Sequence, residues 1–265
     1  MAKLLSSKDV ARFVARGFVR CDALLGKEAC EGLLADVASG GHAEGCHYGM
    51  RLSEAWPRAQ AIRDIFNEPR MLGVITSLLG DDPIYDHHYP HVTEPGQRCG
   101  DNMHQDAVYD TRQFAFDIQI SIFPQETTLE MGGTLILPGS HLRRVNEGDL
   151  VRYQHVTGQE QIVCPAGTVV FWHHNLWHSG RSNRSGSRRM MFKVRLQPSA
   201  RQYRTWNLDD LDDPEVYRIL DQTEPWHGVD GRIEVMNRLA LFRYLSGEEP
   251  GASAPHFGHY LSREG

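Results

Sequence analysis

The sequence predicts a mainly β protein with a jelly-roll core and helices at both ends of the chain. In the middle of the chain, apolar residues recur at every second position in several short segments, and turn-forming residues separate these segments. In the first third, and again after about residue 200, apolar residues recur at helical spacing. Short strands separated by turns are typical of sandwiches and barrels, and we expect a jelly roll here.

The first third is predicted to contain three helices. Ser6 or Ser7 can cap the first helix, and Gly17 follows it as a stop signal. Residues 40–56 contain several glycines and are expected to form a loop. The second and third predicted helices run from about Gly26 to Ala38 and from Ala59 to Leu79.

The middle third is predicted to contain the strands. Phe116–Ile122 alternates apolar with polar residues, which is the pattern of a half-buried strand. Gln161–Cys164 and Thr168–Trp172 are expected to pair across the turn Pro165-Ala166-Gly167. Further strands are expected at Thr134–Leu137, before the turn Pro138-Gly139-Ser140, and at Met190–Leu196.

The last third is expected to return to helix and to complete a single domain. Asp213 followed by Pro214 is a cap and first-turn signal, and a longer helix is predicted from Asp230 toward Leu245. We expect residues 1–265 to form one domain. Its predicted parts are a helical flank at 1–80, a jelly-roll core at about 83–200 and a helical extension at about 201–265.

Composition narrows the class of protein and of partner. Hydrophobic residues make up 40% and charged residues 23%, as in an ordinary globular protein. The net charge of −6 argues against a nucleic-acid partner, which would favour a basic surface. No apolar run reaches the roughly 18 residues of a membrane span, and none near the start resembles a signal peptide. The five cysteines have irregular spacing, so we expect free thiols and a cytoplasmic location.

Two histidines and one carboxylate provide the main chemical signal. His104 and Asp106 are two residues apart, so on a strand their side chains point the same way. A remote histidine would complete the two-histidine, one-carboxylate triad that binds non-haem Fe(II) and leaves three positions open. His178 is our candidate, because a polar loop and two arginines follow it, whereas His173 and His174 directly follow a strand and are expected to pack.

An arginine beyond His178 could bind the far carboxylate of a bidentate co-substrate in a paired hydrogen bond. Arg188 and Arg189 begin the strand that follows, and adjacent strand residues face opposite sides. Only one of the two can therefore point into the core. Taken alone, His104 and Asp106 would more often lie in a surface turn.

In their order along the chain, these motifs resemble those of the phytanoyl-CoA dioxygenase family of Fe(II)- and 2-oxoglutarate-dependent oxygenases. The matches are Phe13–Val19, the run His104-Gln105-Asp106, the segment Gly132–His141, and Ala166–His178 with Asn183 and Arg189. The resemblance implies a double-stranded β-helix core of the cupin-like jelly-roll type. It also implies Fe(II), 2-oxoglutarate as co-substrate, and dioxygen.

The family pattern also assigns roles to residues. His104, Asp106 and His178 would be the metal ligands and catalytic residues. Arg189 would bind 2-oxoglutarate, because the family's arginine follows the distal histidine by eleven residues and 178 + 11 = 189. Gln105 would be a weaker co-substrate contact. Family members often have serine two residues after the distal histidine, where this chain has Gly180; Ser179, one place earlier, is the candidate co-substrate contact.

The expected reaction is hydroxylation of a small molecule with release of succinate and CO2. Related halogenases replace the carboxylate ligand with a small residue, so the presence of Asp106 favours hydroxylation over halogenation. The same ligands support desaturation, cyclisation and epimerisation. Two rival hypotheses are a jelly-roll binding protein without activity and a zinc hydrolase that uses His87, His88, His91 and His104. The second lacks a recognised zinc-site spacing.

Substrate contacts are expected before and after the first metal motif. The candidates are His88, His91, Tyr109 and Arg112, with His87 and Tyr89 as neighbours. If these side chains face inward, the substrate is polar, with an anionic group as one option. Alternation along a strand turns some of them toward solvent. We expect no nucleic acid and no membrane as partner.

Overall fold

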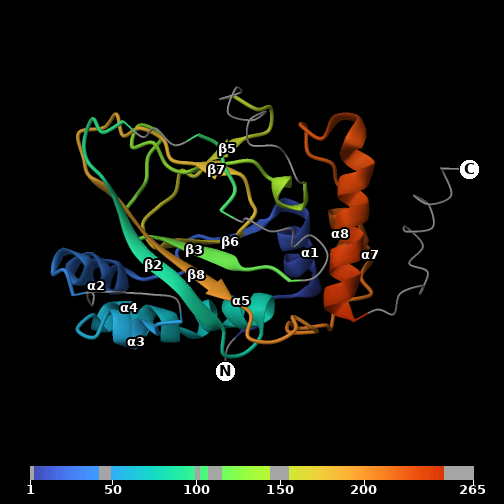
Figure 1. Cartoon of the computed structure of the whole chain (residues 1–265), viewed down its shortest axis with the longest axis horizontal. Helices are drawn as coiled ribbons and strands as arrows, with labels where there is room; N and C mark the ends of the chain where they lie inside the picture. The colour runs from blue at the N-terminus through green and yellow to red at the C-terminus, as the bar shows by residue number, and fades with distance from the viewer. Residues whose placement is uncertain (1–2, 42–48, 99–101, 107–114, 144–154, 248–265) are drawn as a thin grey trace, which may run out of the picture.

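The strands of this computed structural model, which describes residues 3–41, 49–98, 102–106, 115–143 and 155–247, form two antiparallel sheets (Figure 1). The larger sheet has the order β1-β6-β3-β8-β2, and the smaller has the order β5-β4-β7. This arrangement, with helices around it, confirms the predicted fold class. The larger sheet comprises β1 (Phe18–Cys21), β2 (Ile84–Thr93), β3 (Ile118–Phe123), β6 (Thr168–His173) and β8 (Arg189–Gln197). The smaller comprises β4 (Leu135–Ile136), β5 (Glu160–Gln161) and β7 (His178–Ser179).

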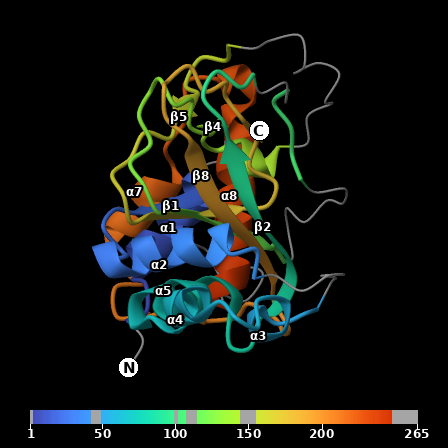
Figure 2. The ribbon, with the colours of Figure 1, turned by 90° about the vertical axis from the view of Figure 1, so that its left-hand side faces the viewer.

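Helices from both ends of the chain cover the larger sheet. Figure 2 shows α2, α4 and α5 stacked beside one another, while α1 packs with α7 and α8. The helices are α1 (Ser7–Arg16), α2 (Lys27–Ala38), α3 (Leu52–Ala55), α4 (Gln60–Asn67), α5 (Pro69–Leu79), α7 (Pro214–Leu220) and α8 (Gly231–Ser246). Two 3-10 turns are η1 (Ser140–Leu142) and η2 (Gly228–Asp230). Within the described residues, no helix is both long and apolar enough to cross a membrane.

The helix ends follow the signals in the sequence. Ser6 caps α1 by accepting a hydrogen bond from the backbone of Asp9, and Gly17 ends it in the left-handed conformation at φ 83°. Asp213 caps α7, with Pro214 in its first turn. One apolar cluster runs from Val10 to Leu245 and joins both flanks to the sheet. This shared cluster supports the single domain, which stays a prediction.

The central strands β3 and β6 of the larger sheet are buried on both faces. Ile118, Ile120 and Ile122 of β3 belong to the helix-covered core, but Gln119 and Ser121 on the other face are also buried. The prediction of a half-buried strand was therefore wrong. The smaller sheet covers the polar face of β3, and the polar side chains of that face lie inside the molecule.

The predicted pairing across Pro165-Ala166-Gly167 was also wrong. β5 pairs with β4, whereas β6 pairs with β1 and β3. Gly167, at φ 80°, donates its N–H to the carbonyl of Phe123 and so lies against the larger sheet. The turn carries the chain from one sheet to the other, which the alternation of residues does not reveal.

The predicted helix over Ala59–Leu79 is two helices. Glu68 has an extended backbone (φ −63°, ψ 131°), and its side chain accepts a hydrogen bond from the N–H of Met71. Pro69 follows in the first turn of α5; proline disfavours helical geometry in the residue before it, so α4 ends there. Within the predicted loop at 40–56, residues 52–55 form the short helix α3.

Candidate metal centre

His104 and His178 are joined through their backbones, although they are 74 positions apart in the sequence. Each N–H donates to the other residue's carbonyl, both at 3.0 Å, in an isolated antiparallel bridge. His178 is the first residue of β7, which pairs with β4 in the smaller sheet. The bridge therefore attaches the segment 102–106 to that sheet and brings both imidazoles to one side.

The two imidazoles and the carboxylate of Asp106 converge. His104 Nε2 lies 3.5 Å from Asp106 Oδ1, and His178 Nε2 lies 3.6 Å from Asp106 Oδ2. One ligand atom from each residue lies within 4.8 Å of the other two. The structure thus brings together the three residues predicted to bind the metal.

Both imidazoles are held in the form that a metal needs. Nδ1 of His104 lies 2.7 Å from the carbonyl oxygen of Asn102, and Nδ1 of His178 lies 2.9 Å from that of Leu176. A carbonyl only accepts, so each Nδ1 carries the proton and each Nε2 keeps its lone pair. The indole of Trp172 stacks on His178 with 5.6 Å between ring centroids. This donor set fits a divalent transition metal.

Asp106 is ionised in this setting. Burial alone would raise the pKa of its carboxyl group. The ammonium group of Lys193, which carries a charge and hydrogen-bonds to this carboxylate, opposes burial, and that pKa lies well below its usual range. Lys193 Nζ lies 2.9 Å from Asp106 Oδ2, and Gln119 Nε2 donates to the same oxygen.

A cavity of about 250 Å³ lies beside the histidines and extends to Arg189. The Arg189 side chain is buried: Nη1 donates to the carbonyls of Met131 (2.8 Å) and Gly132, and Nη2 donates to Thr93 Oγ1 at 2.9 Å. Arg188 instead points outward and pairs with Glu94 at 2.8 Å. As the alternation of strand residues predicted, only one of the two arginines faces inward.

The candidate substrate contacts on β2 lie on its two faces. His91 lines the cavity. His88 does not: it pairs in register with the core residue Val194, and its Nδ1 accepts a hydrogen bond from Trp56 Nε1 at 2.8 Å. The prediction of His88 as a substrate contact was therefore wrong, because the strand turns it toward the helices. Tyr109 and Arg112 lie outside the described residues.

Gln105 and Ser179 are buried or half-buried near the centre but do not line this cavity. Gln105 Nε2 donates to the carbonyl of Asn175 at 2.9 Å, which ties the first metal motif to the loop before His178. Ser179 is paired with Leu135 in the smaller sheet, and Gly180 after it lines the cavity. Their roles as co-substrate contacts stay predictions.

The histidines outside the centre behave as packing residues or lie elsewhere. His173 and His174 are buried and stack with 4.7 Å between ring centroids, and His174 Nδ1 accepts a hydrogen bond from the N–H of Asp117. Of the four histidines in the alternative zinc site, only His104 belongs to a metal-capable cluster within the described residues. The zinc site is therefore not assembled.

Four residues of this centre were missed in the sequence: Thr93, Gln119, Trp172 and Lys193. Lys193 had a usable signal, because it follows Arg189 by four positions on an alternating strand and so shares its face. The other three depend on which strands pair, and the sequence pattern does not contain that information.

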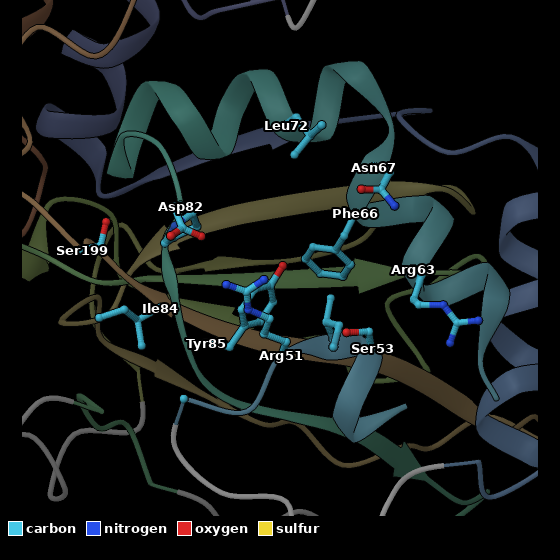
Figure 3. Close-up of a pocket in the computed structure, with 13 residues that line it drawn as sticks. Arg51, Ser53, Arg63, Phe66, Asn67, Leu72, Asp82, Ile84, Tyr85 and Ser199 are labelled. Atoms are coloured by element: carbon cyan, nitrogen blue, oxygen red, sulfur yellow. The ribbon is translucent and has the colours of Figure 1, made fainter. Parts of the chain in front are cut away.

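A larger cavity, of about 450 Å³, lies elsewhere, between α3, α4, α5 and the beginning of β2 (Figure 3). Arg51, Phe66 and Tyr85 point into it. Tyr85 is paired with Leu196 of the main core, so this cavity is on the helix-covered side of the sheet. It contains none of the residues predicted to bind metal or co-substrate.

The sequence matches a protein-family model described as phytanoyl-CoA dioxygenase over residues 13–191. This range includes the two histidines, Asp106 and Arg189. A comparison of the sequence with curated proteins gave no match.

Three solved structures illustrate the shared fold. The first is SnoK, a non-haem alpha-ketoglutarate-dependent carbocyclase from nogalamycin biosynthesis, with a TM-score of 0.59 and 21% identity over 78% of this chain and 88% of that one. The second is HygX from Streptomyces hygroscopicus with nickel, 2-oxoglutarate and hygromycin B bound. Its TM-score is 0.58, and it is 12% identical over 80% of this chain and 94% of that one. The third is the epimerase SnoN in complex with Fe3+, alpha-ketoglutarate and nogalamycin RO. Its TM-score is 0.53, and it is 18% identical over 72% of this chain and 82% of that one. Likeness at these identities shows a shared fold.

The buried histidines predict how the stability of the metal-free protein depends on pH. Burial lowers the pKa of His141 to about 3, of His174 to about 4 and of His178 to about 4, and lowers that of His173 well below its usual value. Between pH 6.5 and 4 the unfolded chain therefore binds protons that the folded chain does not. We expect the free energy of unfolding in urea to decrease as the pH falls through this window, and the stabilising contribution of these histidines to be complete above it. Constant or rising stability toward pH 4 would contradict the buried, neutral state of these imidazoles.

Proposed function

The chain belongs to the phytanoyl-CoA dioxygenase family, whose members use Fe(II), 2-oxoglutarate and dioxygen, and from this premise we propose that His104, Asp106 and His178 hold the iron. The observation that carries the proposal is the convergence of two Nε2 lone pairs with an ionised carboxylate. Two imidazoles and one carboxylate leave three coordination positions open, enough for a bidentate co-substrate and dioxygen.

The protein's own contribution is to fix these donors before any ligand binds. The backbone bridge sets the spacing of the histidines, and the carbonyls of Asn102 and Leu176 set their tautomers. When bound, the iron supplies activation of dioxygen, coupled to oxidative decarboxylation of 2-oxoglutarate to succinate and CO2. Trp172 and Phe123 line the cavity and help to exclude water from it.

Arg189 is our candidate for the distal carboxylate of 2-oxoglutarate. Its side chain lines the cavity, as do those of Thr93 and Thr134. Since Gly180 occupies the position where family members often have serine, a hydroxyl must come from elsewhere. Thr93 already accepts a hydrogen bond from Arg189 and can donate its own proton to a carboxylate oxygen. We assign it as the second anchor.

Within this chemistry we favour hydroxylation of a polar small molecule. The carboxylate ligand Asp106 occupies the position that a halide would need. His91, Gln97 and Lys193 line the cavity with polar groups, which suits a polar or anionic substrate. The similar structures of a carbocyclase and an epimerase show that other outcomes arise on the same fold.

A spectroscopic titration tests the metal centre. Anaerobic addition of Fe(II) and then 2-oxoglutarate to the protein is expected to produce the metal-to-ligand charge-transfer band of a chelated complex. His178→Ala should abolish the band, because it removes one of three ligands, whereas His155→Ala at an exposed position should keep it. A folded wild-type protein without the band would refute the assignment.

Neighbouring arginines provide a matched test of co-substrate binding. Arg189→Met is expected to raise the KM for 2-oxoglutarate by about 10- to 100-fold, because it removes a charge-assisted pair. Arg188→Met makes the same change to an exposed side chain and should leave the KM unchanged. Thr93→Val should raise the KM by a smaller factor, about tenfold. Equal effects of the two arginine variants would count against Arg189 as the anchor.

Isotope labelling separates hydroxylation from the other outcomes. With isotopically labelled dioxygen, a hydroxylated product should carry one labelled oxygen atom, and succinate should form in equal amount. A product that has lost two hydrogen atoms, or only changed configuration, without label would exclude hydroxylation. Mass spectrometry of polar metabolite mixtures treated with the enzyme measures both.

A further inference from the structure

One oxygen of Asp106 is already occupied by two donors from the larger sheet. Lys193 Nζ lies 2.9 Å from Oδ2, and Gln119 Nε2 donates to the same atom. Both side chains are largely shielded: Gln119 is buried and Lys193 is 13% exposed at its side chain. The carboxylate therefore presents two different oxygens, because the donors from β3 and β8 converge on Oδ2 alone.

The arrangement of the sheet aims both donors at this point. β3 and β8 are adjacent, and Ser121 pairs with Lys193 while Gln119 pairs with Arg195. Paired residues in antiparallel strands face the same side, so Gln119 and Lys193 both face the smaller sheet and the centre. The backbone register, rather than a flexible loop, fixes where they lie.

The three cations on this face of β8 have separate partners. Arg189 binds the carbonyls of Met131 and Gly132, and Arg195 pairs with Asp117 at 2.7 Å and with Asp86 at 3.1 Å. Lys193 is the cation directed at Asp106. If the shielded ammonium group moved away from Oδ2, it would lose its carboxylate partner and gain few contacts with water in exchange. Oδ2 therefore stays engaged.

We propose that Lys193, with Gln119, is a positioning residue that reserves Oδ2 of Asp106, so that only Oδ1 is offered to the metal. The inference rests on the proposed function and deepens it. A carboxylate that bound through both oxygens would use one of the three open positions, and a bidentate co-substrate and dioxygen together need all three. Lys193 thereby keeps room in the coordination shell.

Substitution of Lys193 gives a pattern that general loss of structure would not. In Lys193→Met, Asp106 is free to bind through both oxygens. We expect Fe(II) to bind at least as tightly as to the wild type, while 2-oxoglutarate binds the Fe(II) protein about tenfold more weakly or worse. Both dissociation constants are measured anaerobically, the second from the charge-transfer band. X-ray absorption at the metal should detect an additional oxygen ligand.

Three further variants complete the design. Lys193→Arg keeps the charge and should restore most of the affinity for 2-oxoglutarate. Gln119→Leu removes the other donor and should shift both constants in the same directions as Lys193→Met, by a smaller factor. It also tests the proposal if Lys193→Met fails to fold. Lys27→Met changes a lysine that is 86% exposed on α2 and should alter neither constant.

Two results would overturn the proposal. Parallel loss of metal and co-substrate affinity in Lys193→Met would show that Lys193 gives only structural support. Wild-type values of both dissociation constants would show that it has no role at Asp106. Failure of the proposed function looks different, because then the wild-type protein itself would give no charge-transfer band.

Discussion

Two backbone hydrogen bonds between His104 and His178 are the constraint on which the centre depends. They join the segment 102–106 to the edge of the smaller sheet, and they bring together two imidazoles that lie far apart in sequence. Side-chain contacts alone would leave both rings free to choose other rotamers. With the backbones joined and each Nδ1 bound to a nearby carbonyl, one arrangement of the Nε2 atoms remains.

The two faces of the larger sheet have different roles, one in apolar packing and the other in the polar contacts of the centre. On one face, Ile118, Phe171 and Val194 pack against the flanking helices and provide the apolar burial that stabilises the fold. On the other, Gln119, Lys193 and Arg189 face the smaller sheet, where polar groups find partners. Because successive side chains of a strand point to opposite faces of the sheet, each strand contributes both to the apolar core and to the polar face. The rigid apolar layer thereby fixes the polar residues of the centre.

Local signals in the sequence predicted what local physics determines. Ser6, Gly17 and Asp213 act on their own helix ends, so these boundaries were predicted correctly. The proposed metal ligands were identified from their spacing and from the resemblance to the family, and Arg189 from the family's eleven-residue spacing. The structure brings these residues together. Partner strands are a property of the whole fold, so the sequence led to the wrong partner for Gln161–Cys164 and to the wrong face for His88. The donors to Asp106 escaped notice for the same reason.

Charge balance explains why so many cations can lie on one face of β8. Each of Arg189, Lys193 and Arg195 is matched to carbonyls or carboxylates held by a different segment, so none depends on solvent. At Asp106 this matching has a chemical consequence. The ammonium group of Lys193 favours the ionised carboxylate in the metal-free protein, although burial opposes ionisation. In the proposed metal centre, Asp106 would therefore be charged and oriented before a metal arrives, and binding would not require its carboxyl group to lose a proton inside the protein.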